Sequence, residues 1–130
     1  MFSHINMGVS DLELAFAFYD PVFEALGLDL KFNEPTNGWA GWTKAGQEKP
    51  VVIISQPFDD QPHAPGNGQM LAFLADDRAT VTRCFDAALT AGAVSEGEPG
   101  LRPHYHEHYF GAYFRDLDGN KLAVYCFKEA

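Results

Sequence analysis

The residues best suited to chemistry are histidines, and three of the five in the chain lie within residues 104–108. In an extended segment alternate residues share a face, so His104, His106 and His108 are expected to point the same way. Three imidazoles on one face can bind a transition metal or serve as a general base, and such a run can also be a solvated loop that titrates near neutral pH. We favour a loop or pocket wall, because histidines two positions apart lack the longer-range partners of most protein metal sites.

A fourth histidine, His4, lies in a pattern typical of a half-buried strand. Between residues 2 and 9, polar or small residues alternate with apolar ones. His4, Asn6 and Gly8 therefore share the face that is expected to point into a cleft, while the apolar face packs on a helix. An inward imidazole can contact a ligand or a metal. A lone strand histidine is more often a hydrogen-bonded structural residue, so His4 alone does not make a metal site.

Aromatic side chains form a third candidate group. In or beside predicted strands they can line a pocket for a flat or apolar ligand, or they can fill the core. Strand alternation lets only about half of them face a pocket, so Trp39 and Trp42 are expected on opposite faces, and the pattern does not say which faces inward. The group consists of Trp39, Trp42, Tyr105, Tyr109, Tyr113 and Phe114.

The elements that must position these residues occur in the same order twice. Asp11 offers an N-cap and Gly27 a stop for a first helix, in which Pro21 predicts a kink or a break. A second helix is expected over residues 77–91. The expected strands cover residues 2–9, 28–32, 39–44 and 51–56 before a stretch rich in proline and glycine, and 69–75, 93–96, 109–115 and 121–127 after it.

The two halves also match in sequence. The shift that places His4 on Met70 also places Asp11 on Asp77. We therefore predict an α+β fold in which two tandem βαβββ modules form a cleft. A ferredoxin-like sandwich, which needs only four strands, is the alternative. The predicted organisation is a single domain of residues 1–130, with module one at about 1–57, a linker at about 58–68 and module two at about 69–130.

Composition bounds the function classes. The chain of 130 residues is 46% hydrophobic and 14% aromatic, which indicates one well-cored domain and excludes disorder. A formal net charge of −9 argues against nucleic acid or an anionic membrane as partner. There is no run of about 18 apolar residues that would predict a transmembrane helix. Cys84 and Cys126 lie in a predicted helix and a predicted strand without a framework of paired cysteines, which favours a cytoplasmic location.

Several motifs together resemble one protein family. The motifs are His4 with Gly8-Val9-Ser10-Asp11-Leu12 and Phe18-Tyr19, Gly66-Asn67-Gly68, Arg102-Pro103-His104-Tyr105-His106, and Tyr113-Phe114-Arg115-Asp116-Leu117-Asp118-Gly119-Asn120-Lys121. The chain thereby resembles the vicinal oxygen chelate superfamily, which includes glyoxalase I, extradiol dioxygenases and bleomycin- or fosfomycin-resistance proteins. The last motif is the most specific, and it points to the family fold rather than to one activity. Its Asp118-Gly119-Asn120 core is in itself a hairpin signal.

The resemblance implies a metal site with ligands from the first and last strand of each module. His4 matches the first ligand position, whereas the matching positions of the second module hold Met70 and Ala123, and residues 51–56 hold no carboxylate. A thioether and a methyl group do not replace the imidazole and carboxylate donors of a hard divalent ion. We therefore predict a largely dismantled metal site and no cofactor, with His4 leaving room for a divalent metal in a rearranged site.

These observations predict a small-molecule-binding protein of glyoxalase/bleomycin-resistance type. The negative net charge is expected to favour a cationic ligand, and the resemblance implies a homodimer. One alternative is a metal-dependent lyase, isomerase or dioxygenase in which residues 104–108 join His4 at the metal. Another is a structural or interaction module without a ligand. The predicted ligand-binding residues are His4, Asn6, Trp39, Trp42, Met70, His104, His106, Tyr113 and Ala123.

Overall fold

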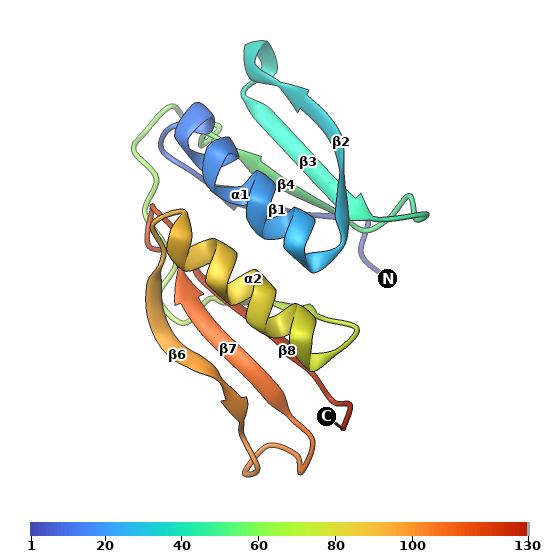
Figure 1. The fold of residues 1–130 in the computed structure, drawn as a ribbon. Coiled ribbons are helices and arrows are strands. Elements are labelled where there is room, and N and C mark those ends of the chain that lie inside the picture. The colour runs from blue at the N-terminus through green and yellow to red at the C-terminus, as the bar shows by residue number, and fades with distance from the viewer. Residues whose placement is uncertain (130) are drawn as a thin grey trace.

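The first half of the chain forms one βαβββ unit. It is seen in a computed structural model, which describes residues 1–129 (Figure 1). Strand β1 pairs in parallel with β4, and the remaining neighbours are antiparallel, so the sheet order is β1-β4-β3-β2. The elements are β1 (His4–Gly8), α1 (Leu12–Leu26), β2 (Leu28–Glu34), the short 3-10 helix η1 (Pro35–Asn37), β3 (Trp39–Lys44) and β4 (Val51–Ser55).

The second half repeats this unit. Its sheet order is β5-β8-β7-β6, again with the first strand parallel to the last. Two tandem βαβββ modules are therefore confirmed, and the ferredoxin-like alternative is wrong because each half has its own four-stranded sheet. The elements are β5 (Leu71–Leu74), α2 (Arg78–Thr90), β6 (Val94–Leu101), β7 (Phe110–Arg115) and β8 (Lys121–Cys126).

Local signals set the helix ends as the sequence predicts. The carboxylates of Asp11 and Asp77 accept hydrogen bonds from the third backbone N–H of their helices, at 3.0 and 2.7 Å. Gly27 ends α1 in the left-handed conformation, with a φ of 91°. A kink or a break is predicted at Pro21; the helix does not break there, and α1 runs on to Leu26. Pro21 faces solvent, and the fully buried Phe23 beyond it holds the last turn against the core.

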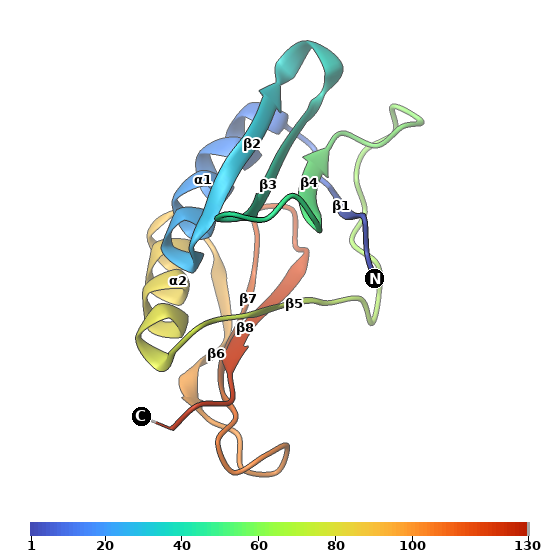
Figure 2. The ribbon, with the colours of Figure 1, turned by 90° about the vertical axis from the view of Figure 1, so that its right-hand side faces the viewer.

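The two helices lie side by side, and each is backed by the sheet of its own module (Figures 1 and 2). The core fills the space between helices and sheets and is continuous across both modules. Phe23 of α1 and Phe73 of β5, for example, have ring centroids 5.5 Å apart. Neither helix is long and apolar enough to cross a membrane within the residues that the structure describes.

The expected strand alternation is present in both leading strands. Met7 and Val9 are buried while His4 and Asn6 are exposed, and in β5 Phe73 is half-buried between exposed neighbours. Strand β6 extends beyond the predicted 93–96, because an edge strand tolerates Pro99 and the register shifts that accompany it. One face of each sheet therefore builds the core.

Candidate functional site

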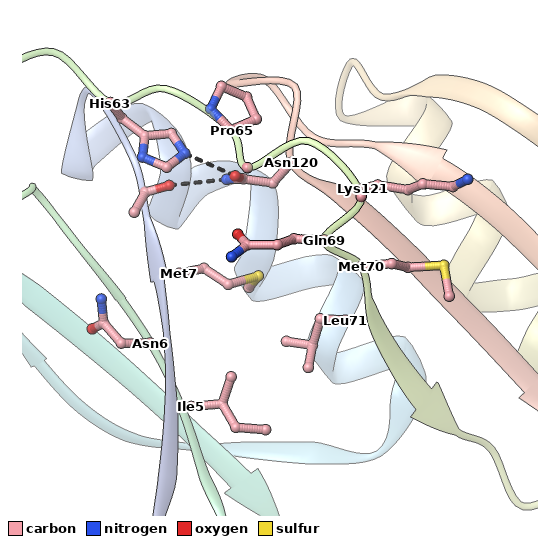
Figure 3. A pocket seen from close by; sticks show the side chains of 13 residues that line it. Ile5, Asn6, Met7, His63, Pro65, Gln69, Met70, Leu71, Asn120 and Lys121 are labelled. Carbon is pink, nitrogen blue, oxygen red and sulfur yellow. Dashed lines mark hydrogen bonds between the residues drawn. The ribbon is translucent and has the colours of Figure 1, made fainter.

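A cavity of about 490 Å³ lies where the two modules meet, and it is the main candidate site. Strand β1, the segment that leads into β5 and the start of β8 surround it (Figure 3). Ile5 and Met7 point from β1 toward Leu71 and form an apolar floor. The polar groups on its rim belong to His63, Gln69 and Asn120, whereas the ammonium group of Lys121, another lining residue, points away from the cavity (Figure 3). The cavity thus combines apolar surface with a few polar groups, as small-molecule sites do.

The β7–β8 turn fastens one side of this cavity by bonding across the module boundary. Asp118 Oδ1 accepts a hydrogen bond from the Ser10 backbone N–H at 3.1 Å. Asn120 Nδ2 donates to the Gly8 carbonyl at 2.9 Å. The motif that the sequence identifies as a hairpin therefore also joins module two to the end of β1.

Asp116, at the start of that turn, is the buried centre of the junction. Its Oδ1 accepts from the backbone N–H groups of Asp118 and Asn120, at 2.9 and 2.8 Å. Its Oδ2 accepts from Asn120 Nδ2 at 2.9 Å and from the Tyr19 hydroxyl. Burial and the neighbouring Asp116 charge raise the pKa of Tyr19 well above its usual value, so the phenol remains a donor. Helix α1 is thereby tied to the β7–β8 turn.

His63 lies over the end of β1 as part of the predicted linker. Its Nε2 is 2.8 Å from Asn120 Oδ1. A Cβ atom at Gly8 would come within 2.7 Å of His63 Cε1, so glycine is required for the imidazole to lie there. The linker is therefore held at the cavity rim by a specific contact.

Two of the predicted ligand-binding residues line this cavity. Asn6 contributes to its wall, although its side chain points the other way and accepts from Ser55 Oγ at 3.0 Å (Figure 3). Met70, at the entry to β5, borders the cavity with a half-exposed side chain. His4 is not among the lining residues; it is exposed at the start of β1, with Nδ1 3.1 Å from Ser3 Oγ.

The two tryptophans face opposite sides of β3, as their spacing predicts. Trp42 is 1% exposed and packs in the core against Phe16 and Phe23, with ring centroids 5.5 and 5.0 Å away. Trp39 is exposed, and its Nε1 donates to Glu34 Oε1 at 2.8 Å. Neither ring lines the cavity, and Trp42 is a core residue because it lies on the helix side of the sheet.

The histidine-rich segment forms the connection between β6 and β7. Figures 1 and 2 place this connection at the end of the molecule away from β1, so it is not brought to His4. His106 Nδ1 accepts the backbone N–H of His108 at 3.0 Å, and the His104 ring lies 4.2 Å from that of Tyr105. The structure therefore does not bring His104 and His106 near His4, although the sequence predicted that all three would contact one ligand.

Tyr113 and Ala123 lie next to each other on the second sheet, beside the cavity rather than in its lining. They are register partners in β7 and β8. The hydroxyls of Tyr113 and Tyr109 are 3.0 Å apart, and Lys121 Nζ lies 5.7 Å from the centre of the Tyr113 ring. Ala123 is almost fully buried. The Lys121 side chain therefore extends over this sheet face and away from the cavity (Figure 3).

The positions that match the family metal ligands do not supply a donor set for a hard divalent ion. Among residues 1–129, no three His, Cys, Asp or Glu side chains lie close enough together to hold a metal. His4 offers an imidazole, Met70 a thioether and Ala123 a methyl group. Soft sulfur and carbon do not meet the preference of such ions for nitrogen and oxygen ligands.

The polar rim residues were missed by the sequence analysis. His63 lies in a stretch whose prolines and glycines predict only a linker, and Asn120 lies in a motif that predicts a hairpin. The polar residues at the end of that motif could have indicated a further role. A turn needs only a glycine and a neighbour that tolerates a similar backbone conformation, so the turn alone does not explain them. Their shared role depends on a contact between segments 57 residues apart.

Comparisons with known proteins agree with this architecture. The model of the Glyoxalase/Bleomycin resistance protein/Dioxygenase superfamily matches residues 1–124. A glyoxalase/bleomycin resistance protein from Albidiferax ferrireducens T118 is 30% identical, with a TM-score of 0.84 over 97% of this chain and 98% of that one. Among curated proteins none matches the chain.

Two more distant structures share the fold. The antibiotic binding protein TnmS3 from Streptomyces sp. CB03234 is 22% identical, with a TM-score of 0.67 over 98% of this chain and 96% of that one. A lactoylglutathione lyase from Agrobacterium tumefaciens is 21% identical, with a TM-score of 0.65 over 97% and 92%. At these identities the likeness extends to the fold alone.

Proposed function

The chain belongs to the Glyoxalase/Bleomycin resistance protein/Dioxygenase superfamily, and from that premise we propose that it binds a small organic molecule in the cavity between its modules. The observation that carries this proposal is the cavity itself, with its apolar floor and convergent polar rim. Its volume lies in the range of about 300–1,000 Å³ typical of ligand pockets. That a structure of the same fold is an antibiotic binding protein supports a binding role.

We propose further that binding does not use the family metal. Met70 and Ala123 stand where the family pattern has donors, and His4 is an isolated imidazole on β1. The alternative, a metal-dependent lyase, isomerase or dioxygenase with ligands from residues 104–108, is not favoured by any contact, because that segment lies away from β1. The rim side chains His63, Gln69 and Asn120 offer hydrogen bonds to a ligand.

The charge of the ligand is better inferred from the cavity than from the whole chain. The net charge of −9 predicts a cationic ligand. No aspartate or glutamate lines the cavity within the described residues, and the one lysine that does, Lys121, directs its ammonium group away from it (Figure 3). A cation in the cavity would therefore meet no carboxylate at contact distance, where charges are screened least. We therefore do not extend the expectation of a cationic ligand to this cavity.

Homodimerisation and a cytoplasmic location remain proposals. Leu74 of β5 and Met70, just before that strand, are exposed and offer apolar surface that a second copy could cover. The thiols of Cys84 and Cys126 are free and buried, as suits a reducing compartment. Light scattering after size-exclusion chromatography measures the mass; a single-chain mass at all concentrations would contradict the dimer.

The proposed function is tested by screening small molecules against metal-free protein. Bound molecules are expected to shift the methyl NMR signals of Ile5, Met7 and Leu71. Ile5→Phe should weaken binding by filling the floor, while the matched control Leu101→Phe, on an exposed edge residue, should not. Shifts confined to other surfaces, or binding that requires added metal, would contradict the proposal.

A further inference from the structure

A second, smaller pocket of about 350 Å³ lies beside the cavity and shares with it the segment that leads into β5. Residues 66–70 form one wall, which is largely backbone because it contains two glycines, and Arg115 and Lys121 form the other. Figure 3 shows the Lys121 side chain extending away from the cavity, on the side to which Met70 also points. Both ionisable residues that line it are cations, and we call it the basic pocket.

The two cations of the basic pocket are neighbours on one face of the second sheet. Arg115, at the end of β7, and Lys121, at the start of β8, are register partners, so their side chains leave the sheet on the same side. Both residues are half-buried. Like charges directly opposite each other on paired strands are destabilising. The fold therefore concentrates positive charge here at a cost in stability, in a chain whose net charge is −9.

Contacts within the second module hold both cations in place. Arg115 Nε donates to Glu96 Oε1 at 2.6 Å, and its Nη1 donates to the Gly119 carbonyl at 3.1 Å. Lys121 Nζ lies 5.7 Å from the centre of the Tyr113 ring, whose face attracts cations. Side chains that are already ordered lose little further freedom when a ligand binds to them.

The positive charge of the pair is only partly balanced. Glu96 is close to both cations: its hydrogen bond to Arg115 lowers the pKa of its carboxyl, and the charge of Lys121 adds to this effect. Within residues 1–129 no carboxylate lies within ion-pair distance of Lys121 Nζ, and Arg115 Nη2 has no hydrogen-bond acceptor. Two cations facing one carboxylate leave positive charge unbalanced, together with N–H donors on both side chains.

These groups define the chemistry of a ligand. We propose that the basic pocket binds an oxyanion, the carboxylate or phosphate group of a small ligand, between Lys121 and Arg115. Ammonium and guanidinium groups form charge-assisted hydrogen bonds to such oxygens, about twice as strong as bonds between neutral groups. The planar guanidinium also matches the geometry of carboxylates and phosphates. This site is additional to the cavity with the apolar floor and does not depend on the binding proposed there.

Inorganic phosphate and acetate test the site in NMR titrations, with the ionic strength held constant by chloride. We expect saturable shifts of the backbone amide signals of Gly66, Gly68 and Lys121 with both anions. Acetamide, the neutral analogue of acetate, should cause none. Tighter binding of phosphate would assign the site to phosphorylated ligands, and tighter binding of acetate would assign it to carboxylates. Shifts that do not saturate, or equal shifts with acetamide, would overturn the proposal.

Variants of Lys121 test its contact with the anion. Lys121→Met should weaken binding of both anions by about tenfold, because a charge-assisted hydrogen bond is lost. Lys121→Arg keeps the charge and should stay within about threefold of the wild type. Lys31→Met is the matched control: it removes the same charge from an exposed residue of β2, in the other module, and should change the affinity less than about twofold. Equal losses in Lys121→Met and Lys31→Met would reveal only an effect of net charge and would overturn the assigned contact.

Glu96→Gln tests the local balance of charge. Glutamine keeps an acceptor for Arg115 Nε but removes the nearest negative charge, so anion binding should strengthen by about threefold or more. Glu48→Gln, at an exposed residue between β3 and β4, makes the same change in net charge and should have no effect. Unchanged or weaker binding in Glu96→Gln would contradict the arrangement. Ile5→Phe, which fills the floor of the cavity, should leave phosphate binding unchanged, so this site and the proposed function fail or succeed separately.

Discussion

Replacing Asp116 by alanine should destabilise the protein far more than the same change at Asp118, two residues later in the turn. Asp116 is 5% exposed, and its carboxylate accepts from two backbone N–H groups, the Asn120 amide and the Tyr19 hydroxyl. Asp118 is more exposed and accepts one hydrogen bond across the module boundary, from Ser10. The two substitutions remove the same charge and the same number of atoms.

The magnitude follows from what each substitution leaves behind. Hydrogen bonds to a charged group contribute about 1.5–3 kcal/mol each, and donors left buried without a partner add a penalty. Because these bonds share one carboxylate and are not additive, Asp116→Ala should lower the free energy of unfolding by about 3–5 kcal/mol. Asp118→Ala should cost only about 0.5–1 kcal/mol, because Asp118 is partly exposed and water can replace its single hydrogen bond to Ser10. A loss of about 4 kcal/mol is a large share of the 5–15 kcal/mol typical of domains.

Urea unfolding followed by tryptophan fluorescence measures both values. Asp116→Asn should fall between them, because an amide of the same size keeps one acceptor but turns an NH₂ group toward donors. Equal costs for Asp116→Ala and Asp118→Ala, or a cost below about 1 kcal/mol for the former, would refute the view that Asp116 joins the modules.

Three further predictions concern the interior. Tyr19→Phe should cost about 1–2 kcal/mol, and because the pKa of Tyr19 is raised in the fold, its stabilisation should be complete below about pH 10 and decline above it, a slope absent from the variant. Burial raises the pKa of Cys84 to about 12, so its thiol should resist a disulfide reagent at pH 8 until the protein unfolds; fast labelling of native protein would contradict this. Trp42→Ala should cost about 3–5 kcal/mol and Trp39→Ala less than about 1 kcal/mol in urea unfolding, and the reverse order would contradict the assigned faces of β3.

Local patterns were enough to predict most of the fold. Capping by Asp11 and Asp77 depends on residues three positions apart, and the alternation in β1 depends on neighbours, so both are visible in the sequence. Of the kink or break predicted at Pro21, the break does not occur, because the burial of Phe23 by distant strands outweighs one lost helical hydrogen bond.

The site was less predictable, since its geometry depends on how distant segments meet. Tyr19 and Asp116 are 97 residues apart, and Gly8 and Asn120 are 112 residues apart. A periodicity of two or 3.6 residues carries no information on such contacts. The inward face expected of β1, which carries His4, is also not the side that lines the cavity floor, because the cavity opens between β1 and the segment leading into β5. The sequence predicts which side chains of β1 share a face, but it does not predict where the neighbouring module lies.

The most direct test of the account is a methyl NMR titration of chelator-treated protein with the molecules that the small-molecule screen identifies. The account predicts saturable shifts of the Ile5, Met7 and Leu71 methyl signals without added metal, and their loss in Ile5→Phe. Shifts that appear only with a divalent metal, or that fall on surfaces outside the cavity, would contradict metal-free binding between the modules.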